Sequence, residues 1–293
     1  MVGGSFQAGL AVPPIRLHDA AVAITGGARG IGRATAKAFA DKGCRVFIGD
    51  LDADLATQVA LEIGGRGFSL DVRSRDSFAT FLRAVGTPLA VLVNNAGIMP
   101  AGPFADEDDA VTDAIVDINT KGVLTGTKLA LDGMLRAGTG HIVNVASYLG
   151  RMPAAGLATY CASKYAVVGF TEAMNDELAG TGVSLTAVLP SAVRTELTSG
   201  VRLGGLLPSV DSDDVAAAIV ASCDHRRRIV AVPAWIRAYE PTAALLPDRL
   251  LGTVRGRLTR DRVLRTLDSA ARSGYEKRVR HAAYGESPGR SGD

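Results

Sequence analysis

A short apolar run that leads through a glycine-rich turn into a helix is the feature that most limits how this chain folds. Residues 20–25 are apolar apart from the final threonine, as is typical of a strand buried on both faces. Residues 26–32 are rich in glycine, and a helical stretch over 33–42 ends at Gly43. Glycines let a backbone approach phosphate closely, and a helix N-terminus supplies N–H groups and positive potential. The pattern therefore predicts a phosphate-binding turn at the edge of a sheet.

The same alternation of apolar runs and helical stretches continues along the chain. Further strands are predicted at 45–49, 67–70, 89–93, 141–145, 184–189 and 229–232, with helices at 53–63, 74–85, 106–137, 158–178 and 211–221. Alternating strands and helices form a parallel sheet with right-handed crossovers, and ligands bind beyond the carboxyl ends of its strands. Asp50, Asp71 and Asn94 each end a strand. We therefore predict an α/β fold of the doubly wound, Rossmann-like kind, with a seven-stranded parallel sheet and helices on both faces.

The chain divides by composition into one large domain and two flanking pieces. Residues 1–18 are predicted to form a flexible arm, 19–234 the nucleotide-binding catalytic domain, and 235–293 a helical extension with a loose end. Within the extension, 249–280 is rich in arginine with spaced leucines and valines, which indicates basic amphipathic helices. These helices are expected to pack on the domain or on a neighbouring subunit. Contact with a membrane surface is an alternative, and nucleic acid is not expected because no recognition motif accompanies the charge.

Overall composition excludes several classes of protein. The net charge is +2, which is no signature of a nucleic-acid-binding protein. The three cysteines are far apart and odd in number, as in reduced cytoplasmic proteins, and the start lacks the basic and continuous apolar regions of a signal peptide. The four histidines show no metal-ligand spacing, so no metal is expected. We predict a cytoplasmic location.

Tyr160 and Lys164 are four residues apart in a predicted helix, and so lie on one face, one turn from each other. A free tyrosine has a pKa of about 10. At about 5 Å and an effective dielectric constant of about 20, a lysine cation favours the phenolate by roughly 3 kcal/mol, or about 2 pKa units. Such a tyrosine is expected to exchange a proton near neutral pH, although this spacing also arises by chance in many helices.

Several motifs together resemble those of the short-chain dehydrogenase/reductase family, over residues 20–232. They are the TGGARGIG sequence at 25–32, the NNAG sequence at 94–97, the PSAVRT sequence at 190–195, and the tetrad Asn119, Ser147, Tyr160 and Lys164. The third motif departs from the family pattern, because Ser191 stands where the family has glycine. The resemblance implies hydride transfer between a nicotinamide dinucleotide and a carbinol carbon, in a homodimer or homotetramer.

The resemblance also implies a role for each matching residue. Tyr160 would be the general acid/base, Lys164 would lower its pKa, Ser147 would bind the substrate oxygen, and Asn119 would hold a water in a proton relay. Cofactor binding would fall to Gly26, Arg29, Gly30, Ile31, Gly32, Asp50, Leu51, Asp71, Val72, Asn95, Ala96, Gly97, Tyr160, Lys164, Pro190, Val193 and Thr195. Plainer roles stay open, with Ser147 as a turn cap, Asn119 as a polar helix residue and Thr195 as an N-cap.

Two residues bear on the choice between NAD and NADP. Asp50 would accept hydrogen bonds from a free ribose diol and repel a 2′-phosphate, which favours NAD. Arg29 lies where family members that use NADP often carry a basic residue. We give Asp50 more weight, because a like-charged contact in a partly buried site costs several kcal/mol. NAD is therefore the expected cofactor.

Apolar residues are expected around the reacting groups Ser147 and Tyr160. The predicted substrate-binding residues are Ser147, Leu149, Met152, Pro153, Leu157 and Tyr160, with Met99 and a lid over 197–207 nearby. These neighbours predict a small lipophilic secondary alcohol or ketone as substrate. The alternatives are a non-catalytic dinucleotide sensor or scaffold, and an NADPH-dependent ketone reductase.

Overall fold

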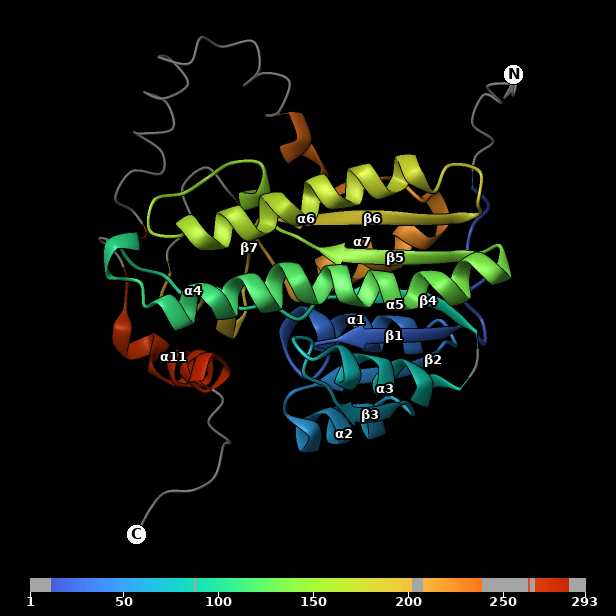
Figure 1. Ribbon diagram of the computed structural model, residues 1–293, viewed down its shortest axis with the longest axis horizontal. Coiled ribbons are helices and arrows are strands. Elements are labelled where there is room, and N and C mark those ends of the chain that lie inside the picture. The colour runs from blue at the N-terminus through green and yellow to red at the C-terminus, as the bar shows by residue number, and fades with distance from the viewer. Residues whose placement is uncertain (1–11, 87, 202–207, 239–262, 264–266, 285–293) are drawn as a thin grey trace.

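Seven parallel strands form the central sheet, in the order β3-β2-β1-β4-β5-β6-β9 (Figure 1). The computed structural model describes residues 12–86, 88–201, 208–238, 263 and 267–284. The strands are β1 Ala21–Thr25, β2 Arg45–Asp50, β3 Arg66–Ser69, β4 Leu89–Asn94, β5 Gly140–Val145, β6 Val183–Pro190 and β9 Ile229–Val232. The strand order reverses between β1 and β4, which creates the crevice where such sheets bind ligands. The predicted fold class is confirmed.

Helices pack on both faces of this sheet. They are α1 Gly30–Ala40, α2 Ala53–Glu62, α3 Arg75–Val85, α4 Asp109–Val116, α5 Gly122–Ala137, α6 Ala158–Glu177 and α7 Ser212–His225. Along β1, Val22 and Ile24 belong to the apolar cluster that contains Phe39 of α1. Ala21 and Ala23 belong to a second cluster, with α3 and α5. Both faces of β1 are therefore buried, as its uninterrupted apolar sequence requires.

Smaller elements shape the carboxyl edge of the sheet. A two-stranded pair joins β7 Ala192–Val193 to β8 Ser209–Val210, and the short helix η4 Glu196–Thr198 follows β7. A π-helix, Asp117–Lys121, connects α4 to α5 and carries Asn119. Single-turn π-helices of this kind often occur at functional sites.

The amino-terminal edge of the sheet is held by Arg226. Its guanidinium donates hydrogen bonds to Ser184 Oγ at 2.6 Å, to the Gly140 carbonyl at 2.6 Å and to the Pro13 carbonyl at 2.9 Å. Ile15 is 6% exposed, and its N–H donates to the carbonyl of Cys223 at 2.9 Å. This part of the predicted arm therefore packs on α7, because Ile15 is buried against that helix and Leu17 packs on the same apolar cluster. Residues 1–11 of that arm lie outside the described residues.

The helix α11, Ser269–Tyr284, lies beyond the carboxyl ends of the strands. In Figure 1 the arrowheads of β1 and β5 point toward the side where α4 and α11 lie, and α11 contacts both α4 and η4. Part of the predicted basic extension thus packs on the domain, while 239–262 and 264–266 fall outside the described residues. Within the described ranges, no helix combines the length and apolarity needed to cross a bilayer.

Candidate active site

One cavity of about 440 Å³ runs along the carboxyl edge of the sheet. Its wall includes residues from the glycine-rich turn, from the ends of β2, β3, β4 and β5, from the segment after β6, and from α11. Of the residues predicted to bind cofactor, it contains Gly26, Arg29, Gly30, Ile31, Asp50, Leu51, Asp71, Val72, Asn95, Ala96, Gly97, Tyr160, Lys164, Pro190, Val193 and Thr195. Residues from distant parts of the sequence thus meet in one place.

The glycine-rich turn has the shape of a phosphate cradle. Gly26 and Gly30 adopt φ angles of 62° and 48°, which residues other than glycine rarely adopt. A Cβ on Gly32 would lie 2.1 Å from the carbonyl oxygen of Gly26, so this position holds the turn tightly against α1 and lies outside the cavity wall. Arg29, at the start of α1, provides no side-chain cap and the first turn holds no acidic residue. The turn therefore fits a dinucleotide pyrophosphate.

Asp50 lies at the end of β2, beside this turn. Its carboxylate accepts hydrogen bonds from the N–H of Ala28 at 3.1 Å and of Asp52 at 3.2 Å. Burial raises the pKa of Asp50, and the two backbone N–H groups oppose that rise. Arg29 makes an ion pair with Asp52, at 2.8 Å between Nη2 and Oδ2. The sequence did not predict this partner for Arg29.

Asp71 and Arg73 form the neighbouring wall, at the end of β3. Arg73 donates to both carboxylate oxygens of Asp71, at 2.9 Å from Nε to Oδ1 and 2.7 Å from Nη2 to Oδ2. Burial raises the pKa of Asp71, but the hydrogen bonds from Arg73 outweigh it and hold the pKa below its ordinary value. Arg73 also donates to the carbonyl of Ala282 in α11. The part of the predicted cofactor site that contains Asp71 is therefore in contact with the C-terminal helix through Arg73.

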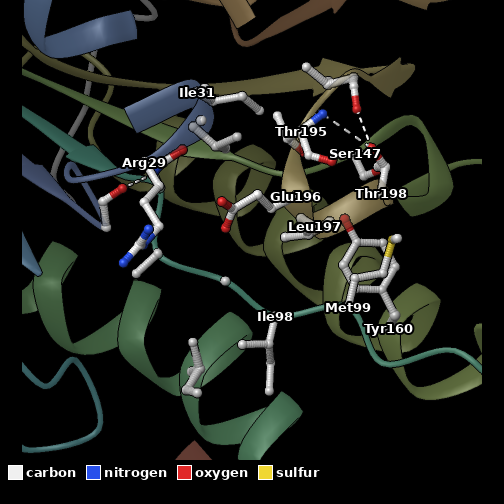
Figure 2. Close-up of a pocket in the computed structure, with 18 of the residues that line it drawn as sticks. Arg29, Ile31, Ile98, Met99, Ser147, Tyr160, Thr195, Glu196, Leu197 and Thr198 are labelled. Carbon is white, nitrogen blue, oxygen red and sulfur yellow. Dashed lines mark hydrogen bonds between the residues drawn. The ribbon is translucent and has the colours of Figure 1, made fainter. Parts of the chain in front are cut away.

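Tyr160 and Ser147 both line the cavity, from the start of α6 and from the residue two positions after β5 (Figure 2). Burial raises the pKa of Tyr160, and a hydrogen bond with the Ser147 hydroxyl partly offsets this. The Ser147 hydroxyl also accepts a hydrogen bond from the N–H of Leu149, at 3.1 Å. Ser147 is thus a turn cap and a neighbour of the phenol at once.

Lys164 lies on the same side of α6 as Tyr160. Its ammonium is 5.6 Å from the centre of the tyrosine ring and donates to the Val145 carbonyl at 2.9 Å. Burial lowers the pKa of Lys164 to about 8. The sequence predicted a tyrosine pKa lowered by this lysine, whereas burial dominates here and the pKa is raised, because a fully buried phenolate loses its hydration.

Asn119 lies behind these groups, outside the cavity wall, and is fully buried. Its side-chain amide donates to the Ile98 carbonyl at 2.9 Å and to Ser163 Oγ at 3.1 Å, while its oxygen accepts from the Ile98 N–H at 2.9 Å. A Cβ on Gly97 would lie 3.2 Å from this oxygen and 3.6 Å from the Lys164 ammonium. The π-helix therefore fixes the segment after β4 next to the lysine.

The segment after β6 closes the cavity from the other side. Ser191, the residue that departs from the family pattern, has no left-handed φ, and its hydroxyl donates to the Pro208 carbonyl at 2.6 Å. The serine is thus accommodated without backbone strain. Thr195 lines the cavity and is also the N-cap residue of η4. Figure 2 shows Glu196 projecting into the cavity between Arg29 and Tyr160.

The predicted substrate-binding residues separate in the structure. Leu149 lines the cavity with Ser147 and Tyr160. Leu157 packs behind Tyr160 in an apolar cluster, Met152 is buried in a different cluster with Tyr148, and Pro153 is exposed, so the structure places none of these three in the cavity wall. Of the predicted lid, 202–207 lies outside the described residues.

Sequence reasoning missed several residues that line the cavity. They are Asp52, Leu70, Arg73, Ile98, Ile118, Val145, Ala146, Tyr148, Ser191, Ala192, Glu196, Tyr275, Arg278, Val279, His281 and Ala282. Most of them are next in sequence to a predicted motif, so the motif could have been extended to include them. For the residues of α11, the only signal in the sequence was the amphipathic spacing of the extension. That spacing predicts a helix but does not indicate that the helix packs against the cavity. Among the described residues, no group of three or more His, Cys, Asp and Glu side chains is placed to hold a metal ion.

The chain belongs to the short chain dehydrogenase family, whose model matches residues 20–204. It is 33% identical over 269 residues to the probable oxidoreductase EphD of Mycobacterium tuberculosis, which covers 82% of this chain and 45% of that protein. The chain thus spans less than half the length of that curated relative. It is also 36% identical over 195 residues to the 2,5-dichloro-2,5-cyclohexadiene-1,4-diol dehydrogenase LinX of Sphingobium indicum, with 64% of this chain and 78% of that protein covered.

A further relative is the 2-(S)-hydroxypropyl-CoM dehydrogenase 3 of Xanthobacter autotrophicus, 41% identical over 186 residues, with 61% of this chain and 73% of that protein covered. The 3-ketoacyl-(acyl-carrier-protein) reductase from Brucella melitensis, solved in complex with NADH, superposes with a TM-score of 0.67 at 28% identity. That superposition covers 74% of this chain and 97% of the other. The relatives named here are thus a probable oxidoreductase, two dehydrogenases and a reductase solved with NADH.

Proposed function

We propose that this protein transfers a hydride between NAD(H) and a small lipophilic secondary alcohol or ketone. The observation that carries the proposal is a single cavity that joins a glycine-lined phosphate cradle to the hydroxyls of Ser147 and Tyr160. Lys164 lies beside the tyrosine ring. This combination supports redox chemistry at a carbinol carbon, because it gives one site for a dinucleotide and another for a reacting oxygen.

Gly26, Gly30 and Asp50 would hold a dinucleotide in this cavity, and its nicotinamide ring would supply hydride transfer. In alcohol oxidation, the Tyr160 phenolate accepts the hydroxyl proton, and the Ser147 hydroxyl donates a hydrogen bond to the same substrate oxygen. The positive charge of Lys164, 5.6 Å from the ring centre, favours the phenolate against the larger opposing effect of burial. The ammonium also lies next to the loop that Asn119 fixes. In ketone reduction the proton moves from Tyr160 to the carbonyl oxygen, whose developing charge Ser147 stabilises.

Asp50 and Asp52 support NAD over NADP. Asp50 is half-buried beside the glycine-rich turn, where a 2′-phosphate would meet its negative charge. Arg29, the residue that could attract that phosphate, is paired with Asp52 at 2.8 Å. Asp50→Ala should therefore narrow or reverse the preference, measured as kcat/KM with NAD and with NADP. Equal use of both dinucleotides by the unaltered protein would contradict this assignment.

The proposed substrate class follows from the apolar surroundings of Tyr160. Met99 and Leu149 are buried in the same cluster as the tyrosine, and Leu197 packs against it. By their names, the relatives include dehydrogenases for 2,5-dichloro-2,5-cyclohexadiene-1,4-diol and for 2-(S)-hydroxypropyl-CoM. A panel of secondary alcohols, followed at the reduced-nicotinamide absorbance band, tests the class. Turnover confined to charged or primary alcohols would overturn it.

We further propose a cytoplasmic homodimer or homotetramer that pairs through α4, α5 and α6. Val116 and Leu124 expose apolar surface on the helices on either side of Asn119, which is the region where family members usually pair. All three cysteines are free thiols, which suits a reducing compartment. Light scattering of the purified protein measures the assembly directly, and a monomer at micromolar concentration would contradict it.

The competing function is a dinucleotide sensor without turnover. Tight NADH binding by a folded protein that oxidises no alcohol and reduces no ketone would support this alternative. The intact set of Ser147, Tyr160 and Lys164 around one cavity favours catalysis instead.

A further inference from the structure

Two backbone segments flank Tyr160, and α11 binds both of them. One is the segment after β4 that contains Met99, and the other is η4 with the residues that follow it. The N–H of Met99 donates to the Tyr275 hydroxyl at 2.6 Å, and its carbonyl accepts from Arg272 Nη2 at 2.8 Å. Both polar backbone atoms of Met99 are therefore satisfied by the C-terminal helix.

Arg272 connects this segment to the opposite one. It is fully buried, and its Nη1 donates to the carbonyls of Ser199 at 2.8 Å and Leu197 at 3.3 Å. Glu276 lies 3.6 Å from its Nε, and the guanidinium stacks 4.9 Å from the centre of the Tyr275 ring. A buried arginine with this many backbone partners is costly to remove or misplace, so it fixes the two segments relative to each other.

The approach of α11 to η4 is close enough to require a glycine. Gly200 has a φ of 67°, and a Cβ there would lie 2.6 Å from the Asp268 carbonyl and 2.8 Å from Arg272 Cγ. The Asp268 N–H donates to the Gly200 carbonyl at 3.0 Å, and Ser199 Oγ donates to the Ala271 carbonyl at 3.2 Å. The start of α11 is thus built against the segment after β7.

Tyr275 occupies the middle of this arrangement and lines the cavity with Tyr160. It is 9% exposed, and burial raises the pKa of its hydroxyl to about 12, so it is neutral at physiological pH. Its proximity is also among the causes that raise the pKa of Tyr160. The aromatic ring therefore forms an apolar wall next to the reacting phenol.

We propose that α11 closes the substrate end of the cavity and that Tyr275 limits the size of the substrate accepted beside Tyr160. This inference rests on the proposed oxidoreductase function and adds a specificity-determining residue to it. Arg272 is the positioning residue, since it touches both flanking segments and the Tyr275 ring. The expected substrates are compact secondary alcohols, because the ring removes space that a larger alcohol needs.

The specificity is tested with cyclohexanol and phenylcyclohexanol, which share a reacting centre and differ in bulk. Tyr275→Ala should raise kcat/KM for phenylcyclohexanol relative to cyclohexanol by about tenfold, the scale on which pockets discriminate apolar groups. Tyr275→Phe keeps the ring and should keep the wild-type ratio. Tyr284→Ala is the matched control, because Tyr284 is on the same helix, bonds Asp108 at 2.6 Å and does not line the cavity.

The kinetic result overturns the proposal if a folded Tyr275→Ala protein keeps the wild-type ratio, or if Tyr284→Ala changes the ratio equally. NADH binding, measured by fluorescence titration, should stay within about twofold of wild type in all three variants. An unchanged affinity for NADH shows that the dinucleotide site is intact, so that a changed substrate ratio can be assigned to the substrate end of the cavity.

Hydrogen exchange followed by mass spectrometry tests the closure without any substrate. Tyr275→Phe removes the acceptor of the Met99 N–H and should speed exchange in the peptide around Met99 by about fivefold, the factor that corresponds to one net hydrogen bond. Arg272→Met should speed exchange in that peptide and in residues 196–201, while β5 stays as in wild type. Unchanged exchange in both segments, or an equal rise in β5, contradicts the closure. If the wild-type protein oxidises no alcohol, the proposed function fails, and these exchange rates still decide whether α11 holds the site closed.

Discussion

Acidification below about pH 6 should weaken this fold through one buried imidazole, His141 in β5. The ring is fully buried, with Nδ1 2.9 Å from Ser184 Oγ and Nε2 3.1 Å from Ser222 Oγ. Arg226 donates to the same Ser184 hydroxyl at 2.6 Å and brings a positive charge close to the ring. Burial first, and then the charge of Arg226, lower the pKa of His141 to about 3, and His225 adds a smaller effect in the same direction.

The size of the effect follows from proton linkage. The unfolded chain has a histidine pKa near 6.5, above the folded value of about 3, so the unfolded state binds the extra proton between these two values. Stability is therefore greatest above pH 6.5 and falls as the pH is lowered toward 3. At pH 5.5 the loss relative to pH 7.5 is about 1.4 kcal/mol from this residue alone.

Urea unfolding at pH 7.5 and pH 5.5 measures this loss, for wild type and for His141→Gln. The change in free energy of unfolding between the two pH values is compared between the two proteins. Carboxylates and other titrating groups contribute equally to both changes, so the difference reports His141 alone. His18→Gln is the matched control, since the His18 side chain is 83% exposed, and it should follow the pH dependence of wild type. The reasoning is refuted if wild type and His141→Gln lose the same free energy of unfolding between the two pH values.

Two further predictions concern the dinucleotide cradle and the assembly. Gly32→Ala should abolish NADH binding in a fluorescence titration, because its Cβ would lie 2.1 Å from the Gly26 carbonyl oxygen; Gly102→Ala, with no atom within 4 Å of its Cβ, should bind normally. Normal binding by Gly32→Ala would rule out the cradle. Leu124→Glu should reduce the mass seen by light scattering, whereas Leu61→Glu, on the remote helix α2, should not; an unchanged mass in both would place the interface elsewhere.

The sheet and the cradle could be predicted because their determinants are local in sequence. The run at 20–24 is apolar at consecutive positions, as is typical of a strand buried on both faces, and the turn after it needs glycines at positive φ. Strand ends such as Asp50 and Asp71 then fall at one edge by the geometry of a parallel sheet alone.

The far wall of the cavity could not be predicted in the same way. Tyr275 and Arg272 are more than 170 residues from Met99, which they contact, and an amphipathic helix does not encode which surface it covers. The ion pair between Arg29 and Asp52 was also missed, since it depends on side-chain directions at the ends of two different elements. The pKa of Tyr160 was predicted from one nearby charge, whereas burial is the larger effect in the structure.

The central claim is that Tyr160 exchanges a proton with the substrate oxygen. Its most direct test compares wild type with Tyr160→Phe, by the rate of NADH formation from NAD and a secondary alcohol that wild type oxidises, together with NADH affinity by fluorescence. We expect the variant to bind NADH as wild type does and to lose kcat by about 10²-fold to 10⁴-fold, the usual contribution of a general acid/base. A Tyr160→Phe protein that keeps its kcat within a few-fold of wild type would contradict the account.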